Sequence, residues 1–278
     1  MRLAVGTLAL LVSCLVLPGP AGAESAEEAG RRIAAAVNGR PRAERATRVA
    51  MLTLIDSDEE RRQRQLLTFW KLEPGVRRLV VFVLSPPEMK HSAFLAIDHF
   101  DASKPDDQWY YKPQRKRTQR IPSLNRGESF LGSDFSFEDL KKEDRLQLDE
   151  YHWKKLGEEQ LAGRSLWKLE QVPVTTELAG ELGYARIVSW VDPEILVRRR
   201  IEFFEVEGAP LKTFDLRDIE QVDGIWTARR IEATHHRTGH RSLLVYSKVD
   251  YQAPIVDETF TPRTLEAERS DRLGPRAP

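Results

Sequence analysis

The fold is decided by one stretch of the sequence, residues 109–140, which contains W-Y-Y-K-P (109–113), R-I-P (120–122) and F-L-G-S-D-F-S-F-E-D-L (130–140). Trp109 and Tyr110 favour a strand, and Lys112-Pro113-Gln114 favours a turn. Gln119-Arg120-Ile121 favours a returning strand that Pro122 ends. The sequence therefore predicts a hairpin with a polar tip, and the stretch contains no plausible catalytic group.

The segment that follows this hairpin predicts a capped helical turn. Gly132 gives the backbone conformational freedom, and Ser133 or Asp134 can accept hydrogen bonds from the N–H groups at a helix start. Three apolar residues then repeat along one face of the turn, namely Phe135, Phe137 and Leu140. We expect this face to pack against a sheet.

The same order of residues resembles the outer-membrane lipoprotein-sorting proteins of Gram-negative envelopes, the LolA-like group. In that group W-x-Y-x-P, an R-I pair and G-S-D-[FL]-[ST]-Y-E-D-[LM] recur, and residues 132–140 differ from the last pattern only at Phe137, where Tyr is usual. The resemblance covers nearly the whole mature chain. It implies structural or lid roles for the motif residues Pro113, Gly132, Ser133, Asp134, Phe135, Asp139 and Leu140.

Alternating polar and apolar residues predict a mainly β protein. Period-two segments such as 187–191 and 243–249, separated by turn signals such as Asp223-Gly224, predict ten or more strands in an antiparallel meander. The run 79–84 is apolar throughout and suits a strand buried on both faces. The resemblance implies an incomplete, half-open antiparallel barrel of about eleven strands with short lid helices over an apolar cavity.

Two segments are candidate pieces of the lid. Ala26 to Val37 has apolar residues at helical spacing and stops at Asn38-Gly39. The second candidate is Ser129 to Leu140, which contains the capped turn.

The N-terminus predicts export. Residues 1–23 are almost uncharged and end in Ala21-Gly22-Ala23, which is typical of a cleaved secretory signal. We expect a single domain at 24–267 in the periplasm, followed by a flexible tail at 268–278. An alternative is that Leu11-Val12-Ser13-Cys14 is a lipobox and Cys14 a lipidated N-terminus, but the segment before Cys14 is short for that signal.

Charge and cysteine content exclude several classes of protein. The chain has 43 Lys and Arg against 43 Asp and Glu, so loss of Arg2 with the signal leaves 42 against 43, or −1. Such a balance gives no attraction to nucleic acid by net charge. Cys14 is the only cysteine and leaves with the signal, so the mature chain has no disulfide, thiolate nucleophile or Cys-based zinc site.

Histidines and basic residues each allow two interpretations. His235, His236 and His240 would suggest a metal site on a helix, but Arg237-Thr238-Gly239 predicts a hairpin turn between them, so we expect no metal and no cofactor.

A basic run can dock acidic lipid headgroups or a membrane partner, or it is simply a solvated hairpin tip. It consists of Lys112, Arg115, Lys116, Arg117 and Arg120. Arg120, in the R-I pair, is expected to point inward toward a polar headgroup or carbonyl.

The sequence predicts a binding protein rather than an enzyme. It contains no G-x-S-x-G, no phosphate-binding glycine loop and no dinucleotide fingerprint. Aromatic residues in strand-like segments are either ordinary core or the wall of a cavity for acyl chains. With Arg120, the candidate ligand-binding residues are Trp70, Phe82, Phe94, Trp109, Trp190, Phe203 and Trp226. Alternation does not reveal which strand face is inside.

These observations favour a monomeric, non-enzymatic periplasmic carrier that binds lipid or lipoprotein acyl chains and delivers them toward the outer membrane. Each buried CH₂ contributes ~0.8 kcal/mol, so a modest cavity with a movable lid suffices. The resemblance implies an inner-membrane transporter of the ABC or RND type as partner. An alternative is a periplasmic lipid or lipoprotein sensor that regulates a membrane signalling or RND-type export system, although the chain shows no obvious linker to a second domain.

Overall fold

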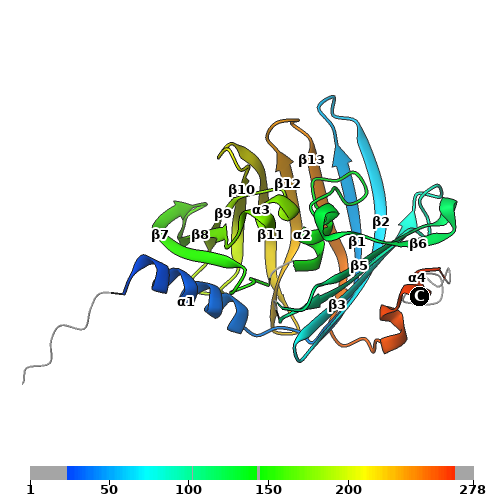
Figure 1. Cartoon of the computed structure of the whole chain (residues 1–278), viewed down its shortest axis with the longest axis horizontal. Coiled ribbons are helices and arrows are strands. Elements are labelled where there is room, and N and C mark those ends of the chain that lie inside the picture. The colour runs from blue at the N-terminus through cyan, green and yellow to red at the C-terminus, as the bar shows by residue number, and fades with distance from the viewer. Residues whose placement is uncertain (1–23, 102, 143–144, 267–278) are drawn as a thin grey trace, which may run out of the picture.

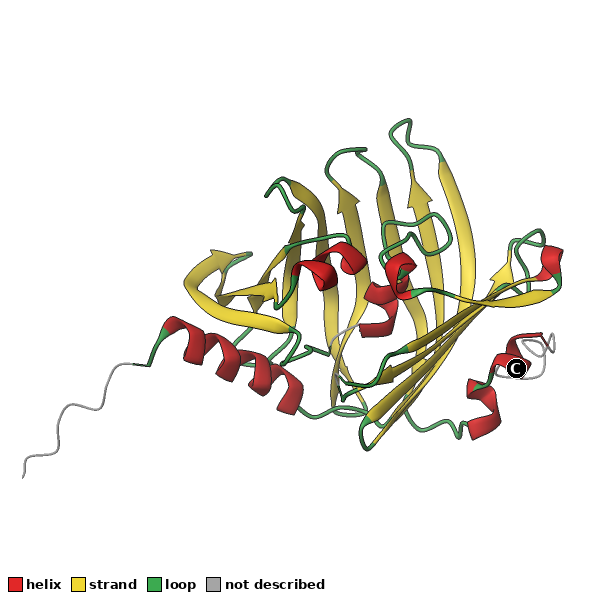
Figure 2. Cartoon of the chain, viewed as in Figure 1, coloured by secondary structure: helices red, strands yellow, loops and turns green. Residues whose placement is uncertain are grey.

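The chain forms one large antiparallel sheet that curls around short helices (Figures 1 and 2). The computed structural model describes residues 24–101, 103–142 and 145–266, so the predicted signal, Cys14 and the predicted tail lie outside it. The strands within the described residues are β1 (Arg45–Ile55), β2 (Arg61–Glu73), β3 (Val76–Ser85), β4 (Ala93–His99), β5 (Asp107–Lys112), β6 (Arg117–Arg120), β7 (Tyr151–Leu161), β8 (Arg164–Pro173), β9 (Arg186–Val191), β10 (Arg198–Phe204), β11 (Pro210–Val222), β12 (Ile225–His235) and β13 (Arg241–Asp250).

The sheet consists of two meanders joined by one pairing. β1 through β6 run in order on one side and β13 back through β7 on the other, and β1 pairs with β13 from Thr47↔Asp250 to Ile55↔Arg241. β6 and β7 are the two edges, so the sheet remains open. The prediction of a half-open antiparallel barrel is confirmed. The described residues form thirteen strands rather than about eleven, because turn signals predict hairpins without fixing their number.

The first strands are buried on both faces. Ala50, Leu52 and Leu54 of β1 face the concave side, in the main core. Phe82 of β3 and Leu67 of β2 face the convex side, where they pack in a second cluster with Phe260 and Leu265 from the C-terminal helical turns. These turns are η3 (Asp257–Phe260) and α4 (Pro262–Glu266), and α4 lies against β4, β5 and β6.

The predicted N-terminal helix is present as α1 (Ala26–Gly39), which lies along β7 (Figure 1). It begins with a capping box, since the Ser25 hydroxyl accepts from the Glu28 N–H at 3.1 Å and the Glu28 carboxylate accepts from the Ser25 N–H at 2.9 Å. Ile33 and Val37 are among its buried residues. No helix in the described part is long and apolar enough to cross a membrane.

A segment that we call the connector, residues 121–142 and 145–150, lies between the two edge strands in the sequence and crosses the concave side of the sheet (Figure 2). Its aromatic side chains contact both halves of the sheet. Phe137 lies 5.1 Å from Phe94 of β4, and Phe135 lies 5.1 Å from Phe214 of β11, measured between ring centroids. The connector carries η2 (Ser123–Asn125) and α2 (Phe137–Lys142), and it fills much of the concave side.

The cap of α2 differs from the prediction. Ser136, not Ser133 or Asp134, caps the helix, because its backbone N–H donates to Asp139 Oδ2 at 2.7 Å and its hydroxyl accepts from the Asp139 N–H at 3.1 Å. Ser133 instead closes the preceding turn by donating to the Phe130 carbonyl at 2.7 Å. Gly132 has φ +74°, as its predicted role requires.

Helix α3 (Thr176–Leu182), which lies between β8 and β9, was not predicted from the sequence. The Thr175 hydroxyl accepts from the Leu178 N–H at 3.1 Å, and Gly183 ends the helix with φ +78°. These are ordinary start and stop signals, but the helix is too short for its periodicity to stand out.

We expect Gly30→Ala to lower the free energy of unfolding by about 1–3 kcal/mol, because a Cβ there would lie 2.5 Å from the backbone nitrogen of Lys154 in β7. Gly39→Ala in the same helix is the control, since a Cβ there meets nothing within 4 Å. Urea unfolding measures both variants. Equal stability of the two would show that α1 does not depend on close approach to β7.

Candidate ligand cavity

A cavity of about 140 Å³ lies on the concave side, between the connector and the strands of the sheet. Its wall is formed by β1, β2, β3, β10, β11, β12 and β13, by the loop after α1 and by connector residues that include Phe135, Asp139 and Leu140. Most lining residues are apolar, for example Leu66, Leu79 and Leu244. The site therefore suits a ligand that is held by hydrophobic burial.

Arginines line the cavity toward the loop after α1, namely Arg40, Arg42, Arg48, Arg77 and Arg145. Arg40 and Arg42 also hold the C-terminus of α1, since each donates to the Val37 carbonyl, at 2.8 and 3.0 Å. Guanidinium groups carry several N–H donors in a fixed geometry. The arrangement can therefore hold an apolar chain and present hydrogen-bond donors at one end of it.

Aromatic rings fix two of these arginines. The guanidinium of Arg48 lies 5.6 Å from the ring centroid of Trp70, 5.1 Å from that of Tyr246 and 5.9 Å from that of Tyr251. The guanidinium of Arg77 lies 5.3 Å from Trp70 on the same strand pair. Cation–π contacts of this kind keep charged groups beside an apolar wall.

A second cavity of about 50 Å³ adjoins the first. The two share Asp139, Arg145, Ile201 and Phe214 as wall residues. The smaller cavity is more polar, with Gln171 and two tyrosine rings in its lining, and the Gln171 Oε1 atom is buried without a hydrogen-bond partner.

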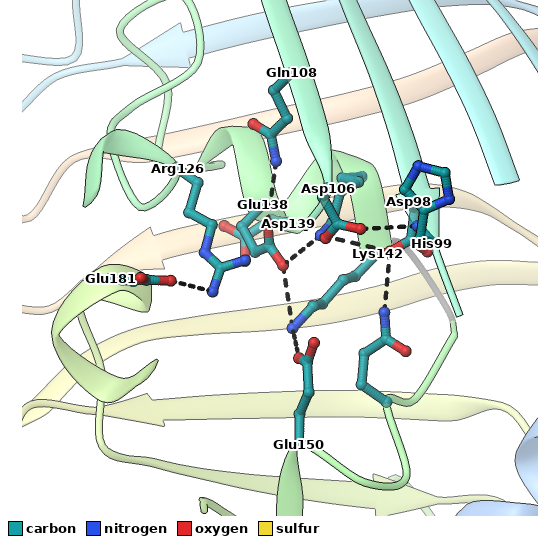
Figure 3. A network of polar contacts seen from close by, with 12 residues as sticks. Asp98, His99, Asp106, Gln108, Arg126, Glu138, Asp139, Lys142, Glu150 and Glu181 are labelled. Atoms are coloured by element: carbon teal, nitrogen blue, oxygen red, sulfur yellow. Dashed lines mark hydrogen bonds and ion pairs between the residues drawn. The ribbon is translucent and has the colours of Figure 1, made fainter. Parts of the chain in front are cut away.

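A buried network of charges fixes α2 beside these cavities (Figure 3). Glu138 and Lys141 are each 1% exposed, and the Lys141 ammonium lies 3.0 Å from Glu138 and 3.5 Å from Asp98 of β4. Lys142 lies 3.1 Å from Glu138 and 2.8 Å from Glu150. The network joins the connector to the first half of the sheet, through Asp98 of β4 and through Asp106, which immediately precedes β5. It also ties α2 to Glu150 at the end of the connector, immediately before β7.

Burial and ion pairing compete in this network. Burial alone would raise the pKa of Glu138, but the ammonium groups of Lys141 and Lys142 outweigh it and hold the pKa far below the ordinary value of 4.5. Burial would likewise lower the pKa of Lys141, yet Glu138 and Asp98 raise it. For Asp98 burial prevails over Lys141 and the pKa is raised. Glu138, Lys141 and Lys142 are therefore charged in the folded protein at neutral pH.

Two further contacts tie the connector to the second half of the sheet. Asp134 accepts hydrogen bonds from the Ser242 hydroxyl at 2.7 Å and the His240 ring at 2.8 Å. Asp139, besides capping α2, forms an ion pair with Lys212 of β11. The connector is thus held at Asp134 and Asp139, two of the predicted motif residues.

The structure places the predicted ligand-binding aromatics in different environments. Trp70 and Trp226 line the larger cavity, and Phe203 lines the smaller one. Phe94 packs in the main core beneath the connector, whereas Phe82 and Trp109 lie in the convex cluster with α4. Trp190 lies in a third cluster with Leu166 and Val188.

Arg120 does not point inward. Its side chain is 60% exposed on the edge strand β6, and it forms an ion pair with Asp107 of β5. Among the predicted motif residues, Phe135, Asp139 and Leu140 line the larger cavity, while Pro113 begins the short η1 turn (Pro113–Arg115) of the hairpin.

The histidines flank a hairpin tip between β12 and β13, as the turn signal predicts. His240 is bound to Asp134, and the His236 ring lies 2.8 Å from the Thr213 hydroxyl. Among the described residues, no three His, Cys, Asp or Glu side chains are grouped so that they could hold a metal ion.

The cavity arginines were not predicted from the sequence, although a signal for them was present. Arg48 lies in register with Ala50 and Leu52 on the concave face of β1, and Arg77 lies in register with Leu79 on β3. An arginine at an alternate position of an otherwise buried face indicates a polar group directed at the interior.

The fold and the site together define a half-open antiparallel barrel with an apolar cavity beneath a crossing connector. A crystal structure described as an outer membrane lipoprotein-sorting protein domain from Vibrio parahaemolyticus is 27% identical, with a TM-score of 0.79 over 86% of this chain and 99% of that chain. A DUF1329 family protein from Desulfovibrio piger is 24% identical, with a TM-score of 0.81 over 87% and 99%. A LolA superfamily protein from Nitrosomonas europaea is 18% identical, with a TM-score of 0.62 over 84% and 97%.

A family model described as "Uncharacterized protein" matches residues 75–267, well over half of the chain. The chain belongs to this family, and its fold is similar to that of the LolA-like lipoprotein-sorting proteins. The search of curated proteins finds no match.

We expect Glu138→Gln to lower the free energy of unfolding at neutral pH by about 3 kcal/mol, because it leaves Lys141 and Lys142 buried with less negative charge beside them. Glu138 has a depressed pKa in the folded state, so its stabilisation is present above 4.5 and is lost as pH falls below that value. The raised pKa of Asp98 acts in the opposite direction. Because Glu138 loses its charge on acidification, the difference in free energy of unfolding between the Glu138→Gln variant and the unsubstituted protein should shrink.

Urea unfolding at neutral and acidic pH measures this effect. Glu159→Gln is the control, since Glu159 forms an exposed pair with Lys168 on neighbouring strands and its loss should change stability little. A Glu138→Gln variant as stable as the control at neutral pH would show that the network does not fix α2.

Proposed function

We propose that this protein is a non-enzymatic periplasmic carrier that binds lipid, or the acyl chains of a lipoprotein, in the cavity beneath the connector and delivers them toward the outer membrane. The observation that carries the proposal is the cavity of about 140 Å³ with a mainly apolar wall. Trp70 and Trp226 are the predicted aromatic residues that we assign to ligand contact.

The connector is the proposed lid. A cavity of about 140 Å³ is close in size to an engineered apolar cavity of ~150 Å³ that holds benzene, so it takes only part of a long acyl chain. Phe130, Phe135 and Phe137 occupy the adjoining space. Displacement of these rings would extend the apolar site along the concave side.

The arginines suit the polar end of such a cargo. Arg48 and Arg77, held by Trp70, lie where an ester, amide or carboxylate oxygen would follow an apolar chain. Movement of cargo in one direction requires a donor and an acceptor, and we propose an inner-membrane transporter of the ABC or RND type as donor. The protein would act as a monomer without a cofactor.

Organic extraction of protein purified from its native periplasm should release a lipid or acylated peptide in nearly stoichiometric amount, measured by mass spectrometry. The extracted protein should then take up a fluorescent acyl probe. Absence of both extracted lipid and probe uptake would refute the carrier function.

Leu216→Trp should weaken binding of the acyl probe at least about tenfold, the equivalent of losing two buried CH₂ groups, because Leu216 lines the cavity and the larger ring fills it. The matched control is Arg217→Trp, which places the same ring on the next, exposed position of β11. Fluorescence titration measures both variants, and their unfolding curves report whether each is folded. Equal affinities would exclude this cavity as the binding site.

A further inference from the structure

The tip of the β5–β6 hairpin carries a cluster of cations on its exposed surface, which we call the cationic tip. It consists of Lys112, Arg115, Lys116 and Arg117. None of the four forms an ion pair within the described residues, and the Lys112 ammonium lies 5.3 Å from the ring centroid of Tyr110. The hairpin projects at the edge of the sheet (Figure 1).

The cationic tip is strained in two ways. Lys112 and Arg117 are directly opposite in the β5–β6 register, and like charges at such positions destabilise a hairpin. Lys116 has φ +46°, a left-handed conformation that is unfavourable for a residue with a side chain. Neutral residues at positions 112 and 117 would remove the charge repulsion, and a glycine at position 116 would remove the backbone strain. The local sequence is therefore better explained by binding than by stability.

The surroundings do not neutralise the cluster. Two acidic residues contact the hairpin: the Glu88 carbonyl accepts from Gln114 at 2.5 Å, and a Glu266 carboxylate oxygen accepts from the Thr118 N–H at 3.2 Å. On the long strands, by contrast, many cations face carboxylates, as Arg229 faces Glu220 at 2.7 Å. The cationic tip concentrates charge in a chain that has equal numbers of basic and acidic residues.

Its shape favours a lipid surface over a protein partner. Protein interfaces have a core of apolar and aromatic residues and are depleted in lysine. Residues 112–117 are all polar or charged apart from Pro113, and the tip is one hairpin wide. Clustered Lys and Arg are attracted to anionic headgroups without needing a complementary pocket.

We propose that the cationic tip docks this protein on an anionic lipid bilayer. The docking surface is separate from the cavity, since none of its four cations lines either cavity. It therefore stands independently of the carrier function, and it would hold the protein at a membrane while cargo is exchanged.

Co-sedimentation with phosphatidylcholine vesicles, with and without phosphatidylglycerol, tests the docking. The protein should bind only the anionic vesicles and should be released at high ionic strength. Each cation removed should weaken binding about fivefold, from ~1 kcal/mol per residue. The variant K112Q/R115Q/K116Q/R117Q should therefore fall to the level seen with neutral vesicles. Its acyl-probe uptake should match that of the unsubstituted protein, and its thermal unfolding should occur at the same or a slightly higher temperature, because the repulsion between positions 112 and 117 is removed.

The matched control is R61Q/R62Q/K104Q/K248Q, which removes the same charge from exposed positions away from the tip. It should retain binding to anionic vesicles. Equal loss of binding in both variants would show a general charge effect and overturn the docking site, as would failure of the unsubstituted protein to bind. Salt-resistant binding to neutral vesicles would overturn it as well, because that result requires apolar insertion.

Discussion

The pairing of β1 with β13 is the constraint on which the rest of the structure depends. It joins the first six strands to the last seven in one sheet, although these segments lie at opposite ends of the chain. The two edges of the sheet, β6 and β7, are consecutive in sequence but farthest apart in strand order. The chain between them must therefore cross the sheet, and the apolar residues of the connector direct it to the concave face.

Charged residues then determine where the connector lies. A buried ion pair loses hydration when it forms, so Glu138 and Lys141 add little net stability compared with apolar residues of similar size. They do specify position, because Lys141 reaches Asp98 and Asp106 only in the arrangement that also places Lys142 beside Glu138 and Glu150. Apolar contacts between Phe rings would tolerate sliding, whereas misplaced charges would be buried unpaired.

Local sequence patterns predicted the helices and hairpins well, but they predicted poorly which side chains line the cavity. The hairpin at 107–120 and helix α1 follow from turn and capping signals that act over a few residues. The roles of Phe82 and Trp70 could not be separated, because both lie in apolar strands and only the long-range β1–β13 pairing and α4 decide which face is concave. Arg120 was expected inside for its motif position, but its neighbour Asp107 holds it on the edge.

The connector also sets the scale of affinity that a carrier of this design can have. Burying one Phe side chain contributes about 1.5–3 kcal/mol, so the three rings Phe130, Phe135 and Phe137 together amount to roughly 5–9 kcal/mol. An acyl chain of about a dozen CH₂ groups contributes ~10 kcal/mol, which is similar. Cargo that takes the place of these rings would therefore gain only the difference between the burial free energy of the acyl chain and that of the three rings. Because the connector already covers the apolar surface, loading and release would both be accessible to the proposed carrier, and a partner with modest preference for one state would set the direction.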